Sequence, residues 1–136
     1  MSRDDASTIP SAYAQALGMH VEGDSDGVPI IAIDFSRNLE GRPGTLHGGA
    51  ISGVLETAGY AALRHALAAE DRCARLKPVN ITIQFLRAGT RVHTQAVGRI
   101  KRLGRRNANV IVEAWQEDRD RPIATAVMNI LMDEEG

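Results

Sequence analysis

Polar and apolar residues alternate along residues 79–85, which is the period of a β-strand with one buried face. The apolar positions of this strand are Val79, Ile81, Ile83 and Phe85. Three more strand-like segments follow, at residues 91–103, 107–115 and 123–132. The connections between these three segments are only a few residues long, whereas a parallel crossover needs a dozen or more, so we expect antiparallel neighbours.

The preceding segment predicts one long helix, from about Gly49 to about Ala69. Its apolar residues recur at helical spacing. They are Ile51, Val54, Leu55, Ala58 and Ala62. Glycine and alanine cover much of the remaining helix surface, so a sheet can wrap closely around it. Glu56 is the only charged residue between Ala50 and Ala62. Because surface helices keep a polar face, we expect Glu56 to lie inside the protein, where a lone carboxylate is paired or functional.

The first third of the chain predicts shorter elements. Residues 11–17 form a candidate helix that ends at Gly18, and residues 23–27 form a candidate turn. Residues 30–35 predict a strand, and residues 36–46 predict a loop that contains Gly41, Pro43 and Gly44. One strand, a long helix and a meander of strands together make an α+β layout.

Composition narrows the class of protein. A chain of 136 residues is long enough for one core, so we expect a single domain over residues 1–136, in which oligomer formation would help to cover apolar surface. The net charge of -1 predicts no general attraction to polyanions. Cys73 is the only cysteine, which suits a reducing compartment. No stretch approaches the roughly 20 apolar residues of a membrane span. Residues 1–10 lack the apolar region of a signal peptide, so we expect a soluble cytoplasmic protein.

The turn His47-Gly48-Gly49 precedes the predicted helix, and a carboxylate, Glu56, follows nine residues after the histidine. Together with the later Phe85-Leu86-Arg87 segment, this pattern resembles the hotdog-fold acyl-CoA thioesterases of the phenylacetate-degradation (PaaI-like) family. The similarity runs from about Gly18 to about Met132. The resemblance implies an antiparallel sheet of five or six strands wrapped around one long helix. It also implies homodimers joined through a continuous sheet, with active sites at the dimer interface, and commonly homotetramers.

The resemblance assigns roles to the residues of this turn. The N–H of Gly48 would polarise the thioester carbonyl, since the first N–H groups of a helix lack partners and lie at the positive end of its dipole. His47 would orient the acyl group, and Gly49 is expected beside the bound substrate. Glu56 would either attack the carbonyl or activate a water molecule, and both routes remain open.

One position departs from the family pattern. Relatives usually carry Asn or Gln six residues before the histidine, and here that position is Gly41. Asn38 lies three residues earlier, and the hypothesis is that the intervening loop brings it into the same place. The other histidines, His20, His65 and His93, show no ligand spacing with cysteines or carboxylates, so we expect no metal and no cofactor.

Basic residues crowd one predicted hairpin in an otherwise nearly neutral chain. They are Arg99, Lys101, Arg102, Arg105 and Arg106. Guanidinium groups bind phosphate oxygens through paired hydrogen bonds, and coenzyme A carries such phosphates. The turn Gly104-Arg105-Arg106 resembles the family segment that holds the nucleotide end of coenzyme A, and Arg87 is a further candidate for this binding. The alternative is a solvated hairpin without a ligand.

The sequence therefore favours an acyl-CoA thioesterase, with a medium-chain or aryl acyl group as the expected substrate. Two alternatives remain within the fold. Hotdog domains also serve as enoyl-CoA hydratases and dehydratases, and a non-catalytic acyl-CoA binding protein is a further possibility. Nucleic acid is disfavoured, because the net charge is slightly negative and no aromatic residues are interleaved with the arginines.

Overall fold

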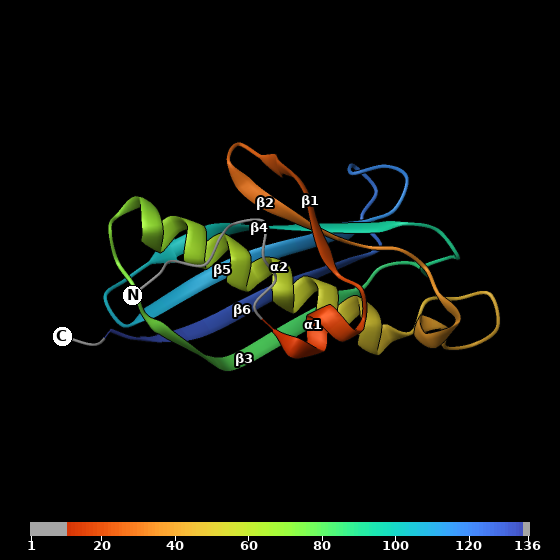
Figure 1. The fold of residues 1–136 in the computed structure, drawn as a ribbon, viewed down its shortest axis with the longest axis horizontal. Helices are drawn as coiled ribbons and strands as arrows, with labels where there is room; N and C mark the ends of the chain where they lie inside the picture. The colour runs from red at the N-terminus through yellow and green to blue at the C-terminus, as the bar shows by residue number, and fades with distance from the viewer. Residues whose placement is uncertain (1–10, 135–136) are drawn as a thin grey trace.

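Six β-strands form one antiparallel sheet that curves around a single long helix in the computed structural model, which describes residues 11–134 (Figure 1). The elements follow one another as α1 (Ala12–Ala16), β1 (His20–Ser25), β2 (Val28–Ile33), the short 3-10 helix η1 (Arg37–Leu39), α2 (Gly48–Ala69), β3 (Arg75–Phe85), β4 (Thr94–Leu103), β5 (Asn107–Trp115) and β6 (Ala124–Asp133). The predicted α+β hotdog layout is confirmed. The expectation about a signal peptide concerns residues 1–10, which lie outside the described residues.

The strands lie in the order β1-β2-β4-β5-β6-β3. The meander of β4, β5 and β6 is the antiparallel set predicted from its short connections. β3 follows α2 in the chain, yet it pairs with β6 from Arg75 opposite Asp133 to Phe85 opposite Ala124. β3 and β1 therefore form the two edges of the sheet, and α2 lies across its concave face.

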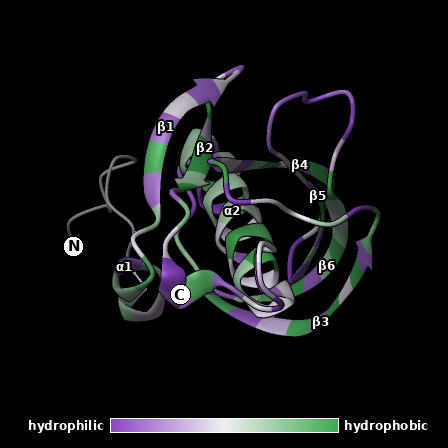
Figure 2. Cartoon of the chain, turned by 90° about the vertical axis from the view of Figure 1, so that its right-hand side faces the viewer, coloured by the Kyte–Doolittle hydropathy of each residue, from purple (hydrophilic) through white to green (hydrophobic). Residues whose placement is uncertain are grey.

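Small residues allow α2 to pack close to the sheet. All the helix residues predicted to be apolar are buried, and Val54, Leu55 and Ala58 have no exposed surface. A Cβ atom on Gly98 of β4 would lie 2.9 Å from the Cβ of Ala62 and 3.1 Å from the carbonyl oxygen of Ala58. Only glycine permits such an approach of strand to helix backbone. The strands consequently curve around the helix, as Figure 2 shows.

The first hairpin differs from the prediction. Residues 23–27 predict a turn, but β1 extends to Ser25 and only Asp26 and Gly27 form the turn itself. Their φ angles are 50° and 88°, and positive φ at both positions is what a two-residue type I′ hairpin turn requires. Sequence reasoning misses β1 because this edge strand is mostly polar and exposed and changes register between Val21 and Asp24.

The predicted short helix α1 packs beside α2 on the open side of the curved sheet (Figure 2). The hydroxyl of Ser11 accepts a hydrogen bond from the N–H of Ala14, and Gly18 follows the helix with a φ of 80°. A Cβ on Gly53 of α2 would lie 3.0 Å from the ring of Tyr13, so the two helices are in close contact. None of the helices within residues 11–134 combines the length and the apolar character needed to cross a bilayer.

His93 ties the loop before β4 to the first hairpin. Its Nδ1 donates a 2.7 Å hydrogen bond to Asp34, and its Nε2 lies 2.5 Å from a carboxylate oxygen of Glu22. Glu22 also lies 3.5 Å from Nε2 of His20, whose ring is 6.1 Å from that of His93. Partial burial opposes charging of the ring, but the two carboxylates together outweigh it and raise the pKa of His93 above its ordinary value.

We expect the free energy of unfolding to fall as the pH rises through the folded-state pKa of His93. A raised pKa means that protonation of the ring stabilises the fold, fully below the unfolded-state pKa of about 6.5 and progressively less above it. Urea unfolding at several pH values checks this, and His93→Gln should show a flatter dependence than wild type. His65→Gln, at an exposed histidine, is the matched control and should keep the wild-type slope. Equal slopes for wild type and His93→Gln would contradict the assignment.

Candidate active site

The turn from His47 to Gly49 begins α2, as predicted. His47 is the N-cap, with an extended backbone, and its Nδ1 accepts a 2.8 Å hydrogen bond from the N–H of Gly49. The His47 carbonyl accepts the N–H groups of Ala50 and Ile51. The N–H of Gly48 has no acceptor among residues 11–134, and Gly48 is exposed. One donor at the positive end of the helix dipole is therefore free for a ligand.

Gly48 lies in an open cleft of about 470 Å³ that also contains His47 and Arg87. A Cβ on Gly48 would lie 3.7 Å from the ring of Phe85, so this ring forms a wall beside the free N–H. The N–H of Leu46 donates a 2.9 Å hydrogen bond to the carbonyl of Gly89, which holds the loop after β3 against the segment that precedes α2. Two segments distant in sequence thus share one cavity.

Two of the predicted binding residues contribute to the fold itself. The N–H of Gly49 is used in the helix cap, so it is not available to a substrate in this conformation. β3 ends at Phe85, and Arg87 belongs to the following loop. Its Nε donates a 3.3 Å hydrogen bond to the carbonyl of Pro122, while the side chain remains exposed along the cleft.

The cleft is lined by Gly41 and not by Asn38. Asn38 is exposed in η1, so the loop does not carry its amide to His47 within one chain. A Cβ on Gly41 would lie 3.2 Å from the Cα of His47, which is tighter than most side-chain contacts. A larger residue at position 41 would therefore require the turn to shift.

Glu56 is exposed, and the expectation that it lies inside the protein is wrong for the single chain. The buried side of α2 carries its larger apolar residues, such as Val54 and Leu55. The side that faces away from the sheet is built largely of small or uncharged residues, including Ser52 and Thr57. A low density of charge therefore reflects the small residues of an open helix face here, and not burial of the whole helix.

Glu56 lines a cavity of about 140 Å³ between α1 and α2. The other lining residues are Ser11, Tyr13, Gly53, Thr57, Tyr60 and Arg64. Tyr60 and Arg64 follow Glu56 at intervals of four residues, so the three side chains share one side of the helix. Burial and then the charge of Glu56 raise the pKa of Tyr60, whereas Arg64 lowers it. Tyr60 therefore keeps its proton next to the carboxylate and can serve as a hydrogen-bond donor.

A single chain does not bring Glu56 to the free N–H of Gly48. Glu56 lies eight positions later, which is about 12 Å along a helix axis. The two residues also line separate cavities. A carbonyl oxygen bound to Gly48 would lie about 3 Å from its nitrogen, so the Glu56 of the same chain is too far away to act on that group.

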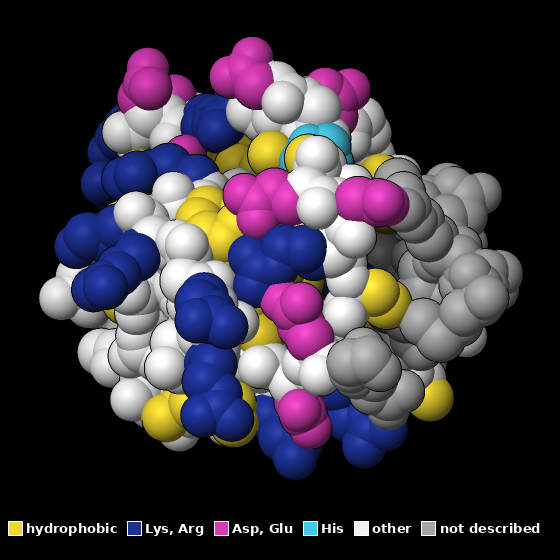
Figure 3. Space-filling view, turned by 90° about the vertical axis from the view of Figure 1, so that its left-hand side faces the viewer, with side chains coloured by type: hydrophobic (Ala, Val, Ile, Leu, Met, Phe, Trp, Pro, Cys, Tyr) yellow, Lys and Arg dark blue, Asp and Glu magenta, His cyan; other side chains and the backbone are white. Residues whose placement is uncertain are grey.

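Arg105 and Arg106 lie beyond the other end of α2. Both are exposed in the turn between β4 and β5, and both line an open groove of about 720 Å³. The same groove contains Asp133 and Glu134. Figure 3 shows this end of the molecule, where many Lys and Arg side chains gather around several carboxylates.

Arg72 fixes the position of this turn. Its Nη2 donates hydrogen bonds to the carbonyl oxygens of Gly104 (3.3 Å) and Arg105 (3.2 Å). The same guanidinium forms ion pairs with Glu70 and Glu134, and hydrogen bonds to these carboxylates raise the pKa of Arg72. The backbone of the arginine turn is therefore held in place, while the side chains of Arg105 and Arg106 have no ion-pair partner among residues 11–134.

Sequence reasoning missed several residues of these cavities. Tyr60 was detectable, because it follows Glu56 by one helical turn. Phe85 and Arg72 reach their sites through contacts between segments far apart in the sequence, and no local pattern predicts such contacts. In the described part of the chain, no group of three or more His, Cys, Asp or Glu side chains is arranged to hold a metal ion.

Comparisons with known proteins agree with this fold. Residues 43–123, which include the turn, Glu56 and the arginines, match the family model described as "Thioesterase superfamily". A conserved protein from Pseudomonas aeruginosa has a TM-score of 0.77 at 23% identity, over 91% of this chain and 95% of that chain. A thioesterase from Haemophilus influenzae has a TM-score of 0.78 at 17% identity, over 92% and 85%. A phenylacetic acid degradation-related protein from Ralstonia eutropha has a TM-score of 0.73 at 21% identity, over 91% of each chain. None of the curated proteins matches significantly in sequence.

Proposed function

The chain belongs to the thioesterase superfamily, and on this premise we propose that it hydrolyses acyl-CoA thioesters to a free acid and coenzyme A. The observation that carries the proposal is the free N–H of Gly48 at the start of α2, in an open cleft. Negative charge develops on the carbonyl oxygen during hydrolysis, and a fixed donor at a helix N-terminus stabilises that charge. Glu56 is the exposed helix carboxylate available as base or nucleophile.

A second protomer, paired along β3, completes the proposed site. Charged residues and proline are confined to the first half of this edge strand, residues 75–78. The second half, residues 80–85, is uncharged. Val79 and Phe85 are 59% and 55% exposed, so apolar surface accompanies the open edge. Two copies that meet antiparallel along this edge would form one continuous sheet with twofold symmetry.

This pairing would bring Glu56 of one protomer level with Gly48 of the other. In an antiparallel pair centred on residues 80–85, Phe85 of one protomer faces Asn80 of the other. Phe85 lies beside Gly48, and Asn80 is about 17 Å away along the strand. Glu56 lies about 12 Å from Gly48 in the same direction along α2. A homodimer would thus hold two composite sites, and two such dimers would form the expected homotetramer.

Glu56 can complete the reaction by either of two routes. As a nucleophile, its oxygen attacks the carbonyl carbon, the C–S bond breaks to release the coenzyme A thiolate, and water hydrolyses the mixed anhydride. As a general base, it takes a proton from a water molecule that attacks the same carbon before the C–S bond breaks. His47, held in its cap orientation, borders the cleft and would orient the acyl group.

The nucleotide end of coenzyme A is proposed to bind at Arg105 and Arg106. Guanidinium groups hold phosphate oxygens through paired hydrogen bonds. The C-cap of α2, Glu70, lies about 21 Å along the helix axis from Glu56, so an extended pantetheine arm would connect the two regions. Arg72 supports this role, because it fixes the backbone of the arginine turn.

A non-catalytic acyl-CoA binding protein is the second candidate. Gly41 favours it, because no amide side chain from residues 11–134 lines the cleft beside His47 to hold an attacking water. Free-thiol release from a panel of short, medium, long and aryl acyl-CoA esters separates the two functions. Release establishes hydrolysis, whereas saturable binding without release by the folded protein would favour the binding function.

Gly48→Pro should lower kcat by about 10²–10³, the loss typical of removing one oxyanion donor. Proline has no N–H but is well tolerated at the first position of a helix, which Gly48 occupies. Gly48→Ala is the matched control, because it keeps the donor and its Cβ meets Phe85 at an ordinary 3.7 Å. Thiol-release kinetics and circular dichroism compare the two variants. Wild-type kcat in a folded Gly48→Pro protein would exclude the N–H from catalysis.

Glu56→Gln should lower kcat by about a hundredfold or more, because it keeps the shape of the side chain but removes its charge and basicity. Glu56→Asp should lose less activity, since it shortens only the reach of the carboxylate.

Co-expressing Glu56→Gln with Gly48→Pro tests the composite site directly. Half of randomly formed dimers contain one of each chain, and each of these has one intact site, so about a quarter of wild-type activity should return. No recovery in verified mixed dimers would show that both groups act within one protomer.

Arg105→Ala and Arg106→Ala should raise KM for acyl-CoA by about tenfold, because each removes a charge-assisted contact to phosphate. Hydrolysis of the corresponding acyl-pantetheine, which lacks the nucleotide, should be unchanged. Parallel kinetics on both substrates make the comparison, and equal losses on both would contradict phosphate binding.

A further inference from the structure

Tyr13 of α1 is an aromatic residue with more than half of its surface exposed. Its ring lies against α2, where a Cβ atom on Gly53 would be 3.0 Å from a ring carbon and 3.3 Å from the hydroxyl oxygen. The same Cβ would lie 3.2 Å from the terminal carbon of Met19. Gly53 is buried, so Tyr13 and Met19 together cover this part of the helix.

The fold fixes the position of α1, and with it the place of the Tyr13 ring. Ala14, the next residue, has no exposed surface. Its N–H donates a hydrogen bond to the hydroxyl of Ser11, and its carbonyl accepts a 3.0 Å hydrogen bond from the N–H of Met19. Met19 is itself only 5% exposed. Because residues on both sides of Tyr13 are anchored in this way, its ring is held over Gly53.

Tyr13 forms one wall of the cavity of about 140 Å³ that also contains Glu56. The aromatic ring of Tyr60 and the bare backbone of Gly53 line the same cavity, so part of its surface suits an apolar group. An apolar cavity of about 150 Å³ is large enough to hold benzene. The cavity beside Glu56 therefore has room for about one six-membered ring, or for a chain of about six carbon atoms.

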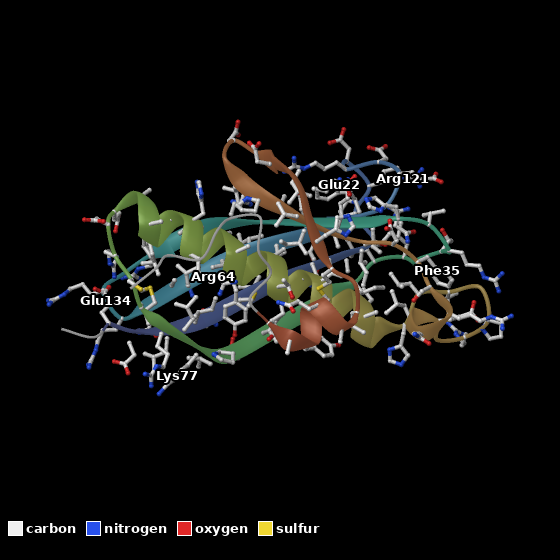
Figure 4. All side chains as sticks on the ribbon, viewed as in Figure 1. Glu22, Phe35, Arg64, Lys77, Arg121 and Glu134 are labelled. Carbon is white, nitrogen blue, oxygen red and sulfur yellow. The ribbon has the colours of Figure 1, made fainter. Side chains whose placement is uncertain are left out.

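The elements around this cavity give it a direction. Gly53 precedes Glu56 by three positions and Arg64 follows it by eight, so they lie about 4.5 Å and about 12 Å from it in opposite directions along the helix axis. Along the long axis of the molecule, Arg64 lies between α1 and the end that carries Glu134 (Figure 4). Glu134 lines the groove of the arginine turn. Tyr13 and that groove are therefore on opposite sides of Glu56.

This arrangement separates the two halves of a bound thioester. The carbonyl carbon carries the sulfur on one side and the acyl chain on the other. When the carbonyl lies beside Glu56 and the pantetheine arm runs toward the arginine turn, the acyl chain is directed toward α1. The ring of Tyr13 then lies across the path of the chain.

We propose that Tyr13 limits the length of the acyl group, because its ring closes the acyl pocket at the α1 end. Linear acyl groups of up to about six carbons and acyl groups with one ring then fit the pocket, whereas longer chains meet the ring. This rests on the proposed function, in which hydrolysis takes place at Glu56 and the nucleotide binds at the arginine turn. Tyr13 acts here as a specificity-determining residue and takes no part in bond making or breaking.

The cleft beside Gly48 is the other space near the reacting groups. It is open and larger, at about 470 Å³, and its lining includes the apolar side chains of Ile51 and Leu86. An acyl chain in this open cleft would meet no closed end, so the enzyme would hydrolyse long and short chains with similar efficiency. The dependence of hydrolysis on chain length therefore distinguishes the two spaces.

The test measures thiol release from butanoyl-, hexanoyl- and decanoyl-CoA. The length ratio is kcat/KM for decanoyl-CoA divided by kcat/KM for butanoyl-CoA, and we expect it to be below about one tenth for wild type. Tyr13→Ala should raise the length ratio by about tenfold or more, because the ring that stops the longer chain is removed. Tyr13→Phe keeps the ring and should keep the low ratio. Tyr13→Trp places a larger ring at an exposed position, and should lower the efficiency for hexanoyl-CoA relative to butanoyl-CoA by about threefold.

Leu86→Ala is the matched control. Leu86 is 50% exposed, similar to Tyr13, but it lines the cleft beside Gly48. Its truncation should change the length ratio by less than about twofold, because no acyl chain is proposed to lie there. Circular dichroism and sedimentation check that every variant keeps the wild-type fold and assembly.

Each contrary result has a distinct meaning. Equal efficiency of wild type on decanoyl-CoA and butanoyl-CoA, or an unchanged length ratio in a folded Tyr13→Ala protein, would overturn the length limit and leave the thioesterase function intact. A length ratio that rises in Leu86→Ala but not in Tyr13→Ala would assign the acyl chain to the cleft and overturn the proposal. A rise in Tyr13→Phe equal to that in Tyr13→Ala would assign the effect to the hydroxyl group and overturn the role of the ring.

No hydrolysis of any ester by the folded wild type would overturn the proposed function itself. The length limit is then tested by calorimetric affinities for the same three esters. Tyr13→Ala should again favour decanoyl-CoA over butanoyl-CoA by about tenfold relative to wild type, and an unchanged preference would overturn the proposal.

Discussion

Close packing of α2 against the concave face of the sheet determines most of the other features of this protein. Gly98 lets the backbone of β4 approach Ala58 and Ala62, and the larger aliphatic side chains of the helix fill the space on either side. Because one face of the helix is fully used in this way, its opposite face and its N-terminus are left open. Gly48 and Glu56, the two groups to which the proposed function assigns the chemistry, are exposed on those open parts.

The two groups proposed to act on the thioester differ in how firmly the fold holds them. The N–H of Gly48 is fixed by the helix itself, and the cap of His47 on Gly49 keeps the first turn ordered without using that donor. Glu56 lies on a flexible side chain at the surface, next to Tyr60. A backbone donor and a carboxylate eight positions apart on one helix cannot meet, and this separation is the strongest structural reason to expect that the working unit contains two copies of the chain.

Local sequence patterns predicted the elements that are half-buried and regular. The alternation of residues 79–85 and the apolar spacing of residues 51–62 predicted β3 and α2, because burial on one face imposes a period. β1 carries no such period, since it is an exposed edge. For the site, the turn at His47 was predictable because caps are local, whereas the exposure of Glu56 was not. Small residues count as apolar in the sequence pattern and so suggested a buried helix, yet they form an open helix face here. The position of Asn38 could not be predicted because it depends on loop geometry. The hydrogen bonds of Arg72 to the arginine turn could not be predicted because they join residues distant in sequence.

The long open edge of β3 also bears on how the chain behaves before it is assembled. Residues 80–85 lack the charges and proline with which monomeric proteins protect edge strands. Val79 and Phe85 of the same strand are exposed. A newly made chain would therefore expose a strand edge that can pair with any extended polypeptide nearby. Dimerisation along this edge would then compete with aggregation. The yield of native protein should then depend on protomer concentration during folding. The β3 edge would thus influence how much chain folds correctly as well as how the folded chains assemble.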